Sequence, residues 1–367
     1  MKPELPKLPS VAELLQHPTL QTVVQRVNQS TIAQRTTGFL DELKQNLRNR
    51  SEPGIVPTIS QLAERLASRL LGKTRQASPV INATGVVLGD AWSTLPLAET
   101  VIHQILCVAG EYQVDGKAAA DFALPTLCEL TGSESAWVAA NLAGAKHLVA
   151  QQQDWNIDLA PQAGLVNPSE FGLAAVETIG DRLKSGADVV VVDGAGLLGG
   201  PSCGMVLGRR ARIDLLAAHS LAPLLVADRL TLTALEATLD VYRKPDRAMH
   251  QIPVLQLLGT PQANLQQRAE RLAPLMAEHS AVAEATALAC QSSWCDTAAN
   301  QSLAPSWAVS LKPKDLSVER FVDRLGAGQS NVLGRVEQDV VLLDLRSVFP
   351  RWDQQLVAAV GEVSGSD

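Results

Sequence analysis

The most strongly patterned stretch of the chain lies between residues 188 and 208. Four consecutive valines, Val189–Val192, predict a strand that is buried on both faces. A glycine-rich segment and a second apolar run at residues 205–207 follow, and a helical pattern begins near Arg210. Three of the glycines match G-x-G-x-x-G, but Gly200-Pro201 and another strand follow where a dinucleotide-binding loop needs a helix. The pattern therefore favours a tight turn between two buried strands.

Helical spacing of apolar residues dominates the first 75 residues. Ser10 and Glu13 predict a capping box at the start of the first helix. Two further helices are expected at residues 31–47 and 58–72. Residues 1–75 are therefore expected to form a helical N-terminal module.

From residue 79 onward, short apolar runs alternate with helical patterns. Strands are expected at residues 79–90, 135–141, near 165–166, 306–311, 332–336 and 340–345, and residues 110–122 are expected to form a loop. Helices are expected at residues 95–110, 124–130, 143–153, 174–185, 228–242, 261–278, 315–325 and 350–362. This order predicts an α/β domain over residues 76–260 and a C-terminal α+β domain over residues 261–367.

Composition and charge narrow the functional classes. The 367 residues are 46% hydrophobic, yet no apolar run approaches the ~18 to 20 residues of a membrane span. The first ten residues show no signal-peptide pattern and the five cysteines are scattered, so we expect a cytoplasmic protein with reduced thiols. Residues 1–78 carry 11 Lys/Arg and 6 Asp/Glu, a net charge of +5, whereas the rest carries −12. The basic segment is either a polyanion-binding surface, for RNA for example, or a solvated helical face.

Motifs for common chemistries are missing from the sequence. The six histidines show no metal-ligand spacing, so no metal site is expected. Neither a G-x-S-x-G elbow nor a P-loop is present.

Eight segments, in order from end to end, resemble the bacterial L-seryl-tRNA(Sec) selenium transferases. They are LPSVAELL (8–15), PVINATGVVL (79–88), LPLAE (95–99), LCELTGSESAWV (127–138), GADVVVVDGAGLLGGPSCGMVLGR (186–209), ADRLTLTALEATLDVY (227–242), PSWAVSL (305–311) and GRVEQDVVLLDLRSVFP (334–350). The resemblance implies a pyridoxal-phosphate (PLP)-dependent transferase domain of fold type I, here in a shortened form, with PLP as the family cofactor.

The glycine-rich turn departs from that family at its central residue. The family places a lysine there, which holds PLP through a Schiff base, but this chain has Gly196. Glycine has no amine and cannot make that bond. The nearest lysine in sequence, Lys184, lies on a predicted helix and is expected to be a solvated surface charge. The resemblance therefore implies no catalytic residue at this position.

The remaining departures also fall on the family's cofactor pocket. About 80 residues of βα units are missing near residues 150–158, by the usual size of such units. Asp158 matches either the family aspartate that pairs with the pyridine nitrogen or a plain capping residue, and Asn141 is either an anion donor or a helix N-cap. The histidine, asparagine and arginine that follow the first strand in the family are replaced within residues 89–94.

These departures lead to a functional hypothesis with one alternative. The leading interpretation is a selenium transferase-like protein that has lost PLP catalysis, binds no cofactor and serves as a binding or assembly partner. The alternative is an active L-seryl-tRNA(Sec) selenium transferase that uses PLP and makes selenocysteyl-tRNA(Sec). Expected partners are further copies of this chain in a homo-oligomer, tRNA at the basic N-terminal module, and a full-length selenium transferase.

Overall fold

The computed structural model describes residues 9–17, 20, 36–40, 58–60, 62–63, 66, 80–92, 94–110, 112, 117–297, 300–328 and 330–363. The chain divides into two compact units, Met1–Pro79 and Val80–Asp367. The predicted start of the α/β domain at residue 76 falls outside the described residues. Each unit is considered by itself below.

The first unit is helical where it is described. Helix α1, Val11–Leu15, begins with the predicted capping box: the Glu13 backbone N–H donates to Ser10 Oγ at 3.2 Å, and the Ser10 N–H donates to Glu13 Oε2 at 2.7 Å. Residues 36–40 are also helical, but most of the predicted helices at 31–47 and 58–72 lie outside the described residues. A small apolar core contains Leu14, Leu20, Phe39, Leu40, Leu62, Ala63 and Leu66.

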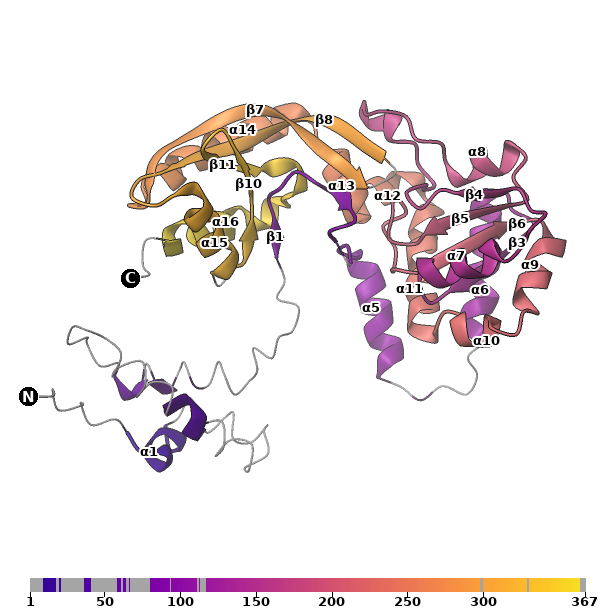
Figure 1. Ribbon diagram of the computed structural model, residues 1–367, viewed down its shortest axis with the longest axis horizontal. Helices are drawn as coiled ribbons and strands as arrows, with labels where there is room; N and C mark the ends of the chain where they lie inside the picture. Colours follow the sequence, from indigo (N-terminus) through magenta and orange to yellow (C-terminus); the bar gives the residue numbers. More distant parts are fainter. Residues whose placement is uncertain are drawn as a thin grey trace, which may run out of the picture. The chain divides into compact units, whose positions relative to one another are not determined.

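The second unit contains a four-stranded sheet in the order β3-β6-β5-β4 (Figure 1). Its strands are β3 Ser135–Ala139, β4 Ile157–Leu159, β5 Val189–Asp193 and β6 Gly204–Gly208. Strand β6 is antiparallel to both neighbours, whereas β4 and β5 are parallel. The strand–turn–strand order predicted around the valine run is confirmed, and helix α9, Arg210–Ala217, follows as expected.

Helices cover both faces of this sheet, which explains the unbroken valine run. Val189 and Val191 face a core with α7 Leu142–Ala150, α9 and α10 Ala222–Leu225. Val190 and Val192 face the opposite core, with α6 Lys117–Thr131, α8 Ile179–Lys184 and α11 Arg229–Tyr242. All four valines are fully buried, as side chains that alternate between two covered faces must be.

The second sheet has the order β10-β11-β8-β7-β2, and a separate parallel pair joins β1 to β9. These strands are β1 Ile81–Asn82, β2 Leu88–Gly89, β7 Val282–Thr297, β8 Asn300–Pro313, β9 Val332–Leu333, β10 Arg335–Glu337 and β11 Val340–Asp344. Helices α14 Gln262–Ala277, α15 Val318–Ala327 and α16 Asp353–Glu362 share a core with residues of β1, β7, β8, β9 and β11, whereas Leu88 of β2 lies in the core that contains Val190 and Val192. The domain boundary at residue 260 stays a prediction, and β1 and β2 show that these sheets also take strands from residues 81–89.

The remaining elements in the described part of the second unit are three helices and three short turns. They are α5 Glu99–Ala109, α12 Pro245–Gln251, α13 Pro253–Leu258 and three short 3-10 turns, Pro168–Phe171, Leu345–Ser347 and Pro350–Trp352.

The structure differs from the prediction in several places: one strand is misplaced, one loop is partly helical and one long strand was missed. The predicted strand at 79–90 forms only β1 and β2, and the predicted helix at 174–185 begins at Ile179. No strand forms near residues 165–166; the strand of that region is β4, which is set by its pairing of Ile157 with Val189. The predicted loop at 110–122 overlaps α6, which begins at Lys117 in an alanine-rich segment that favours helix. The 16-residue β7 was not predicted, because its alternating alanines, serines and cysteines have low strand propensity on their own.

Candidate functional site

The glycine-rich turn between β5 and β6 is held in a single conformation by its own backbone. The Gly194 N–H donates to the Cys203 carbonyl at 2.9 Å, and the Gly200 N–H donates to the Gly194 carbonyl at 2.8 Å. Gly199 has φ +64°, a left-handed conformation that glycine adopts without strain. From α11, the buried Tyr242 hydroxyl donates to the Leu198 carbonyl at 2.9 Å.

Gly196 lies in this turn where there is no space for a side chain. A Cβ at this position would lie 2.7 Å from the Pro161 carbonyl oxygen and 3.3 Å from the Cα of Gln162. The Pro161 oxygen is fixed, because it accepts a hydrogen bond from the Asp193 N–H at 3.2 Å. A lysine at 196 would therefore require the backbone of residues 161–162 to move.

A pocket of 410 Å³ opens beside Gly196 at the end of β5. Its walls come from the segment after β2, the first turns of α7, residues 161–162 and the glycine-rich turn. Three charged residues line it: Asp193, the last residue of β5, Lys146 on α7, and Asp90 in the segment after β2.

Burial raises the pKa of two groups in this turn, the Asp193 carboxyl and the Cys203 thiol. Burial raises the pKa of the Asp193 carboxyl, while hydrogen bonds from the backbone N–H groups of Ala195 and Cys203 and the charge of Lys146 oppose that rise. Burial, helped by the negative charge of Asp193, raises the pKa of the Cys203 thiol to about 12. Cys203 is therefore an inert core thiol and no nucleophile at neutral pH.

The two predicted cofactor-binding residues have structural partners. Asn141 is the N-cap of α7, and its side-chain oxygen accepts from the Gly144 N–H at 2.8 Å. Asp158 lies in β4, and both of its carboxylate oxygens accept from the Arg182 guanidinium at 2.9 Å. Neither residue lines the 410 Å³ pocket. A cofactor role for either one stays a prediction.

Lys146 lines the pocket, although no sequence pattern singled it out. Lys184 ends α8 and is exposed, as expected, and it does not line the pocket. Lys146 does line it, but in sequence it is one residue of a helical repeat with no motif around it. Only the packing of α7 across the end of the sheet brings Lys146 and Gly196 to one pocket.

Among the described residues, neither a metal-binding group nor a membrane-spanning helix is found. Among the residues described there is no group of three His, Cys, Asp or Glu side chains that could hold a metal ion. None of the helices described there is both long and apolar enough to cross a bilayer. All five cysteines are free of disulfides.

The sequence and fold can now be compared with known proteins. The family model described as L-seryl-tRNA selenium transferase matches residues 147–349, more than half of the chain. The chain belongs to the L-seryl-tRNA selenium transferase family. A family member named L-seryl-tRNA(Sec) selenium transferase, from Moorella thermoacetica, is 28% identical over 97% of this chain and 96% of its own length. Others are the Carboxydothermus hydrogenoformans protein, 25% identical over 94% of both chains, and the Yersinia enterocolitica protein, 34% identical over 55% of this chain and 45% of its own.

This chain has fewer residues than its alignment with the Moorella relative has positions. The alignment with the Moorella protein spans 457 positions and this chain has 367 residues, so at least 90 aligned positions hold no residue of this chain. The place of the missing segment, near residues 150–158, stays a prediction.

The fold prediction is confirmed by solved structures. D-Glucosaminate-6-phosphate ammonia-lyase superposes with a TM-score of 0.53, covering 85% of this chain and 99% of that chain at 14% identity. The fold of this selenium transferase relative is that of PLP-dependent enzymes of fold type I, which the resemblance implied.

Proposed function

We propose that this protein is a selenium transferase relative that has lost PLP catalysis and acts as a binding or assembly partner. The observation that carries the proposal is the closed position at Gly196: the residue has no amine, and the Pro161 carbonyl lies 2.7 Å from where a Cβ would be. The family's Schiff base cannot form at this position, because glycine provides no amine nitrogen and the backbone leaves no space for a longer side chain. The residues present therefore do not fit a cofactor bound in the family's manner.

The second candidate is an active L-seryl-tRNA(Sec) selenium transferase. It is favoured by the alignment with the Moorella protein over 97% of this chain, and by Lys146, which provides an amine on the wall of the same pocket. In such an enzyme, Lys146 on α7 would provide the reactive amine in place of a lysine in the glycine-rich turn.

Cofactor binding separates the two candidates. Purified protein is titrated with PLP, treated with borohydride and digested, and the peptides are analysed by mass spectrometry. The proposal expects no saturable visible absorbance band and no lysine modified above the background level of an exposed lysine such as Lys184. A pyridoxyl adduct on Lys146 that Lys146→Met abolishes would establish the second candidate in its place.

The assembly role is supported by an apolar surface on the second unit. Helix α5 buries only Val101 among its eleven residues, while Ile102 and Leu106 on it are 45% and 67% exposed. Phe122 on α6 is 63% exposed. Single exposed apolar residues are common, but an apolar helix with one buried residue is typical of a covered surface. We propose that a second copy of this chain covers it in a homo-oligomer.

The mass of the protein in solution tests this assembly. Light scattering after size exclusion is expected to give a multiple of 39.1 kDa, and Leu106→Glu is expected to lower it. Leu303→Glu is the matched control, because Leu303 on β8 is 61% exposed and lies outside this surface. Unchanged mass in Leu106→Glu would remove α5 from the interface. Co-purification with a full-length selenium transferase tests the mixed assembly.

We also propose that the basic N-terminal module binds tRNA and that the protein acts in the cytoplasm. The net charge of +5 over residues 1–78 supports this, since Lys and Arg neutralise phosphates. A gel shift with seryl-tRNA(Sec) is expected to weaken as salt rises and to vanish when residues 1–75 are deleted. Unchanged tRNA affinity after that deletion would refute the role of the module.

A further inference from the structure

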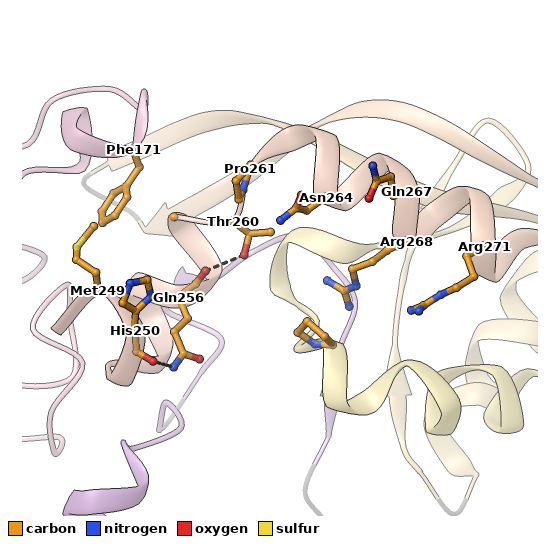
Figure 2. Close-up of a pocket in the computed structure, with 12 residues that line it drawn as sticks. Phe171, Met249, His250, Gln256, Thr260, Pro261, Asn264, Gln267, Arg268 and Arg271 are labelled. Atoms are coloured by element: carbon orange, nitrogen blue, oxygen red, sulfur yellow. Dashed lines mark hydrogen bonds between the residues drawn. The ribbon is translucent and has the colours of Figure 1, made fainter. Parts of the chain in front are cut away.

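A second, larger pocket of 810 Å³ lies between the 3-10 turn Pro168–Phe171, α12, α13 and α14 of the second unit (Figure 2). Twelve residues line it, and none carries a carboxylate. The lining includes two arginines, a histidine and three side-chain amides. In a chain of net charge −7, this lining has two guanidinium groups and no carboxylate, a composition that favours an anion.

Helix α14 supplies the polar wall. Asn264, Gln267, Arg268 and Arg271 recur at spacings of three and four residues and so lie on one face of the helix. The opposite stripe of α14 (Leu265, Ala269, Leu272, Ala273 and Met276) is buried in the apolar core. The apolar stripe fixes the helix, and the polar stripe is thereby directed into the pocket.

One buried carboxylate holds both arginines. Asp353, at the start of α16, accepts from Arg268 at 2.6 Å and from Arg271 at 2.5 Å, and its side chain is 7% exposed. Arg268 also donates to the Val348 carbonyl at 3.0 Å and is 11% exposed, so it serves the structure. Arg271 is 63% exposed and gives Asp353 only one nitrogen. Two guanidinium groups on one carboxylate leave one positive charge, which Arg271 presents to the pocket.

The other end of the pocket is apolar and aromatic. Figure 2 shows Phe171, Met249 and His250 together at the end away from Arg268 and Arg271. The Phe171 ring is fixed against Gly259, where a Cβ would lie 3.1 Å from two ring carbons. Rings and a thioether accept a planar group by stacking and sulfur contact.

We propose that this pocket binds a nucleoside monophosphate. The phosphate pairs with Arg271, the amides of Asn264 and Gln267 face the sugar, and the base lies against Phe171 and Met249. A volume of 810 Å³ falls within the ~300–1,000 Å³ of pockets for small molecules. The proposal is independent of PLP binding, because no residue is shared with the pocket at Gly196.

Calorimetry on the full chain tests the proposal, with AMP, ribose 5-phosphate, inorganic phosphate and adenosine as probes. AMP is expected to bind saturably, and more tightly than ribose 5-phosphate by roughly 5- to 100-fold if the base stacks. Arg271→Gln is expected to weaken AMP by roughly 10-fold or more and to leave adenosine unchanged, because it removes a charge-assisted contact. Arg271→Lys is expected to fall between Arg271→Gln and the unmodified chain.

The control is Arg320→Gln, which removes an exposed arginine on α15 outside the pocket. Thermal unfolding of each variant checks that the fold is retained. The proposal is overturned if AMP gives no saturable heat, if AMP binds no more tightly than inorganic phosphate, or if Arg271→Gln and Arg320→Gln bind AMP equally well.

Discussion

Gly196→Ala is the smallest substitution that tests whether residue 196, the family's lysine position, has space for a side chain. The added Cβ would lie 2.7 Å from the Pro161 carbonyl oxygen, which cannot retreat without breaking its 3.2 Å hydrogen bond to the Asp193 N–H. Overpacking of this kind costs about 1–3 kcal/mol. The alanine also restricts the unfolded chain, which returns about 0.4–1 kcal/mol because Gly196 does not have positive φ. The expected net effect is a loss of about 1–2 kcal/mol in the free energy of unfolding.

Gly110→Ala is the matched control for this substitution. Gly110 is the C-cap of α5 with φ −84°, and the nearest atom to its Cβ, the Leu106 carbonyl oxygen, is at 3.8 Å. With open space and an allowed backbone, this variant is expected to gain up to about 1 kcal/mol.

Differential scanning calorimetry of the full chain compares the two variants. A loss of 1 kcal/mol corresponds to a fall of about 2–4 °C in Tm for a unit of this size. Gly196→Ala should therefore melt below the unmodified protein and Gly110→Ala at or above it. If Gly196→Ala melts at or above the unmodified protein, the position is open, and the main support for lost PLP binding fails.

Three further predictions concern the same turn. Tyr242→Phe removes the hydroxyl that donates to two buried carbonyls and is expected to cost about 1–3 kcal/mol in urea unfolding; an unchanged midpoint would show that the turn does not depend on it. Asp193 has a raised native pKa, so it binds more protons when folded, and its contribution to stability falls as pH rises from 3.8 through the native pKa. Asp193→Asn is therefore expected to gain stability relative to the unmodified chain over that interval, measured as the difference in urea midpoints, and a constant difference across pH would contradict the assignment. Because burial raises its pKa to about 12, Cys203 is expected to react with iodoacetamide at pH 8 far more slowly in the folded protein than after unfolding in urea, and equal rates by mass spectrometry would contradict its burial.

Local sequence patterns were sufficient for the elements that surround the turn. Val189–Val192 alternates between two covered faces, so its position as a central strand follows from composition alone. Helix α11 was predicted to within a residue because Asp228 caps it, accepting from the Thr231 N–H at 2.8 Å. The long β7 was missed because its strand conformation depends on pairing with β8, which no local pattern records.

The sequence predicted the missing lysine at residue 196, but it did not predict which other residues line the pocket. Comparison of the sequence with the family pattern identifies Gly196 at the position of the family lysine. The Pro161 carbonyl beside it and Lys146 across the pocket reach the site from a loop and a helix that are distant in sequence. Their places depend on how β4 and α7 pack on the sheet, and neither residue type is unusual in its own segment.

The turn after β4 contacts Gly196 and follows Asp158, which the resemblance matches either to the family aspartate or to a capping residue. At its start, the Ala160 N–H donates to the Val191 carbonyl at 2.9 Å, and the Pro161 carbonyl accepts from the Asp193 N–H at 3.2 Å, so the beginning of the turn is fixed to β5. Just before it, Asp158 gives both carboxylate oxygens to Arg182, whose buried Nε has no hydrogen-bond partner among the described residues. Releasing Asp158 to pair with a pyridine nitrogen would deprive that partly buried guanidinium of its main partner. A lysine at residue 196 would thus require this turn to leave β5, and a pairing of Asp158 with a pyridine nitrogen would require Asp158 to leave Arg182. Restoring a lysine at residue 196 would meet neither requirement, so Gly196→Lys is expected to be destabilised and to bind no PLP.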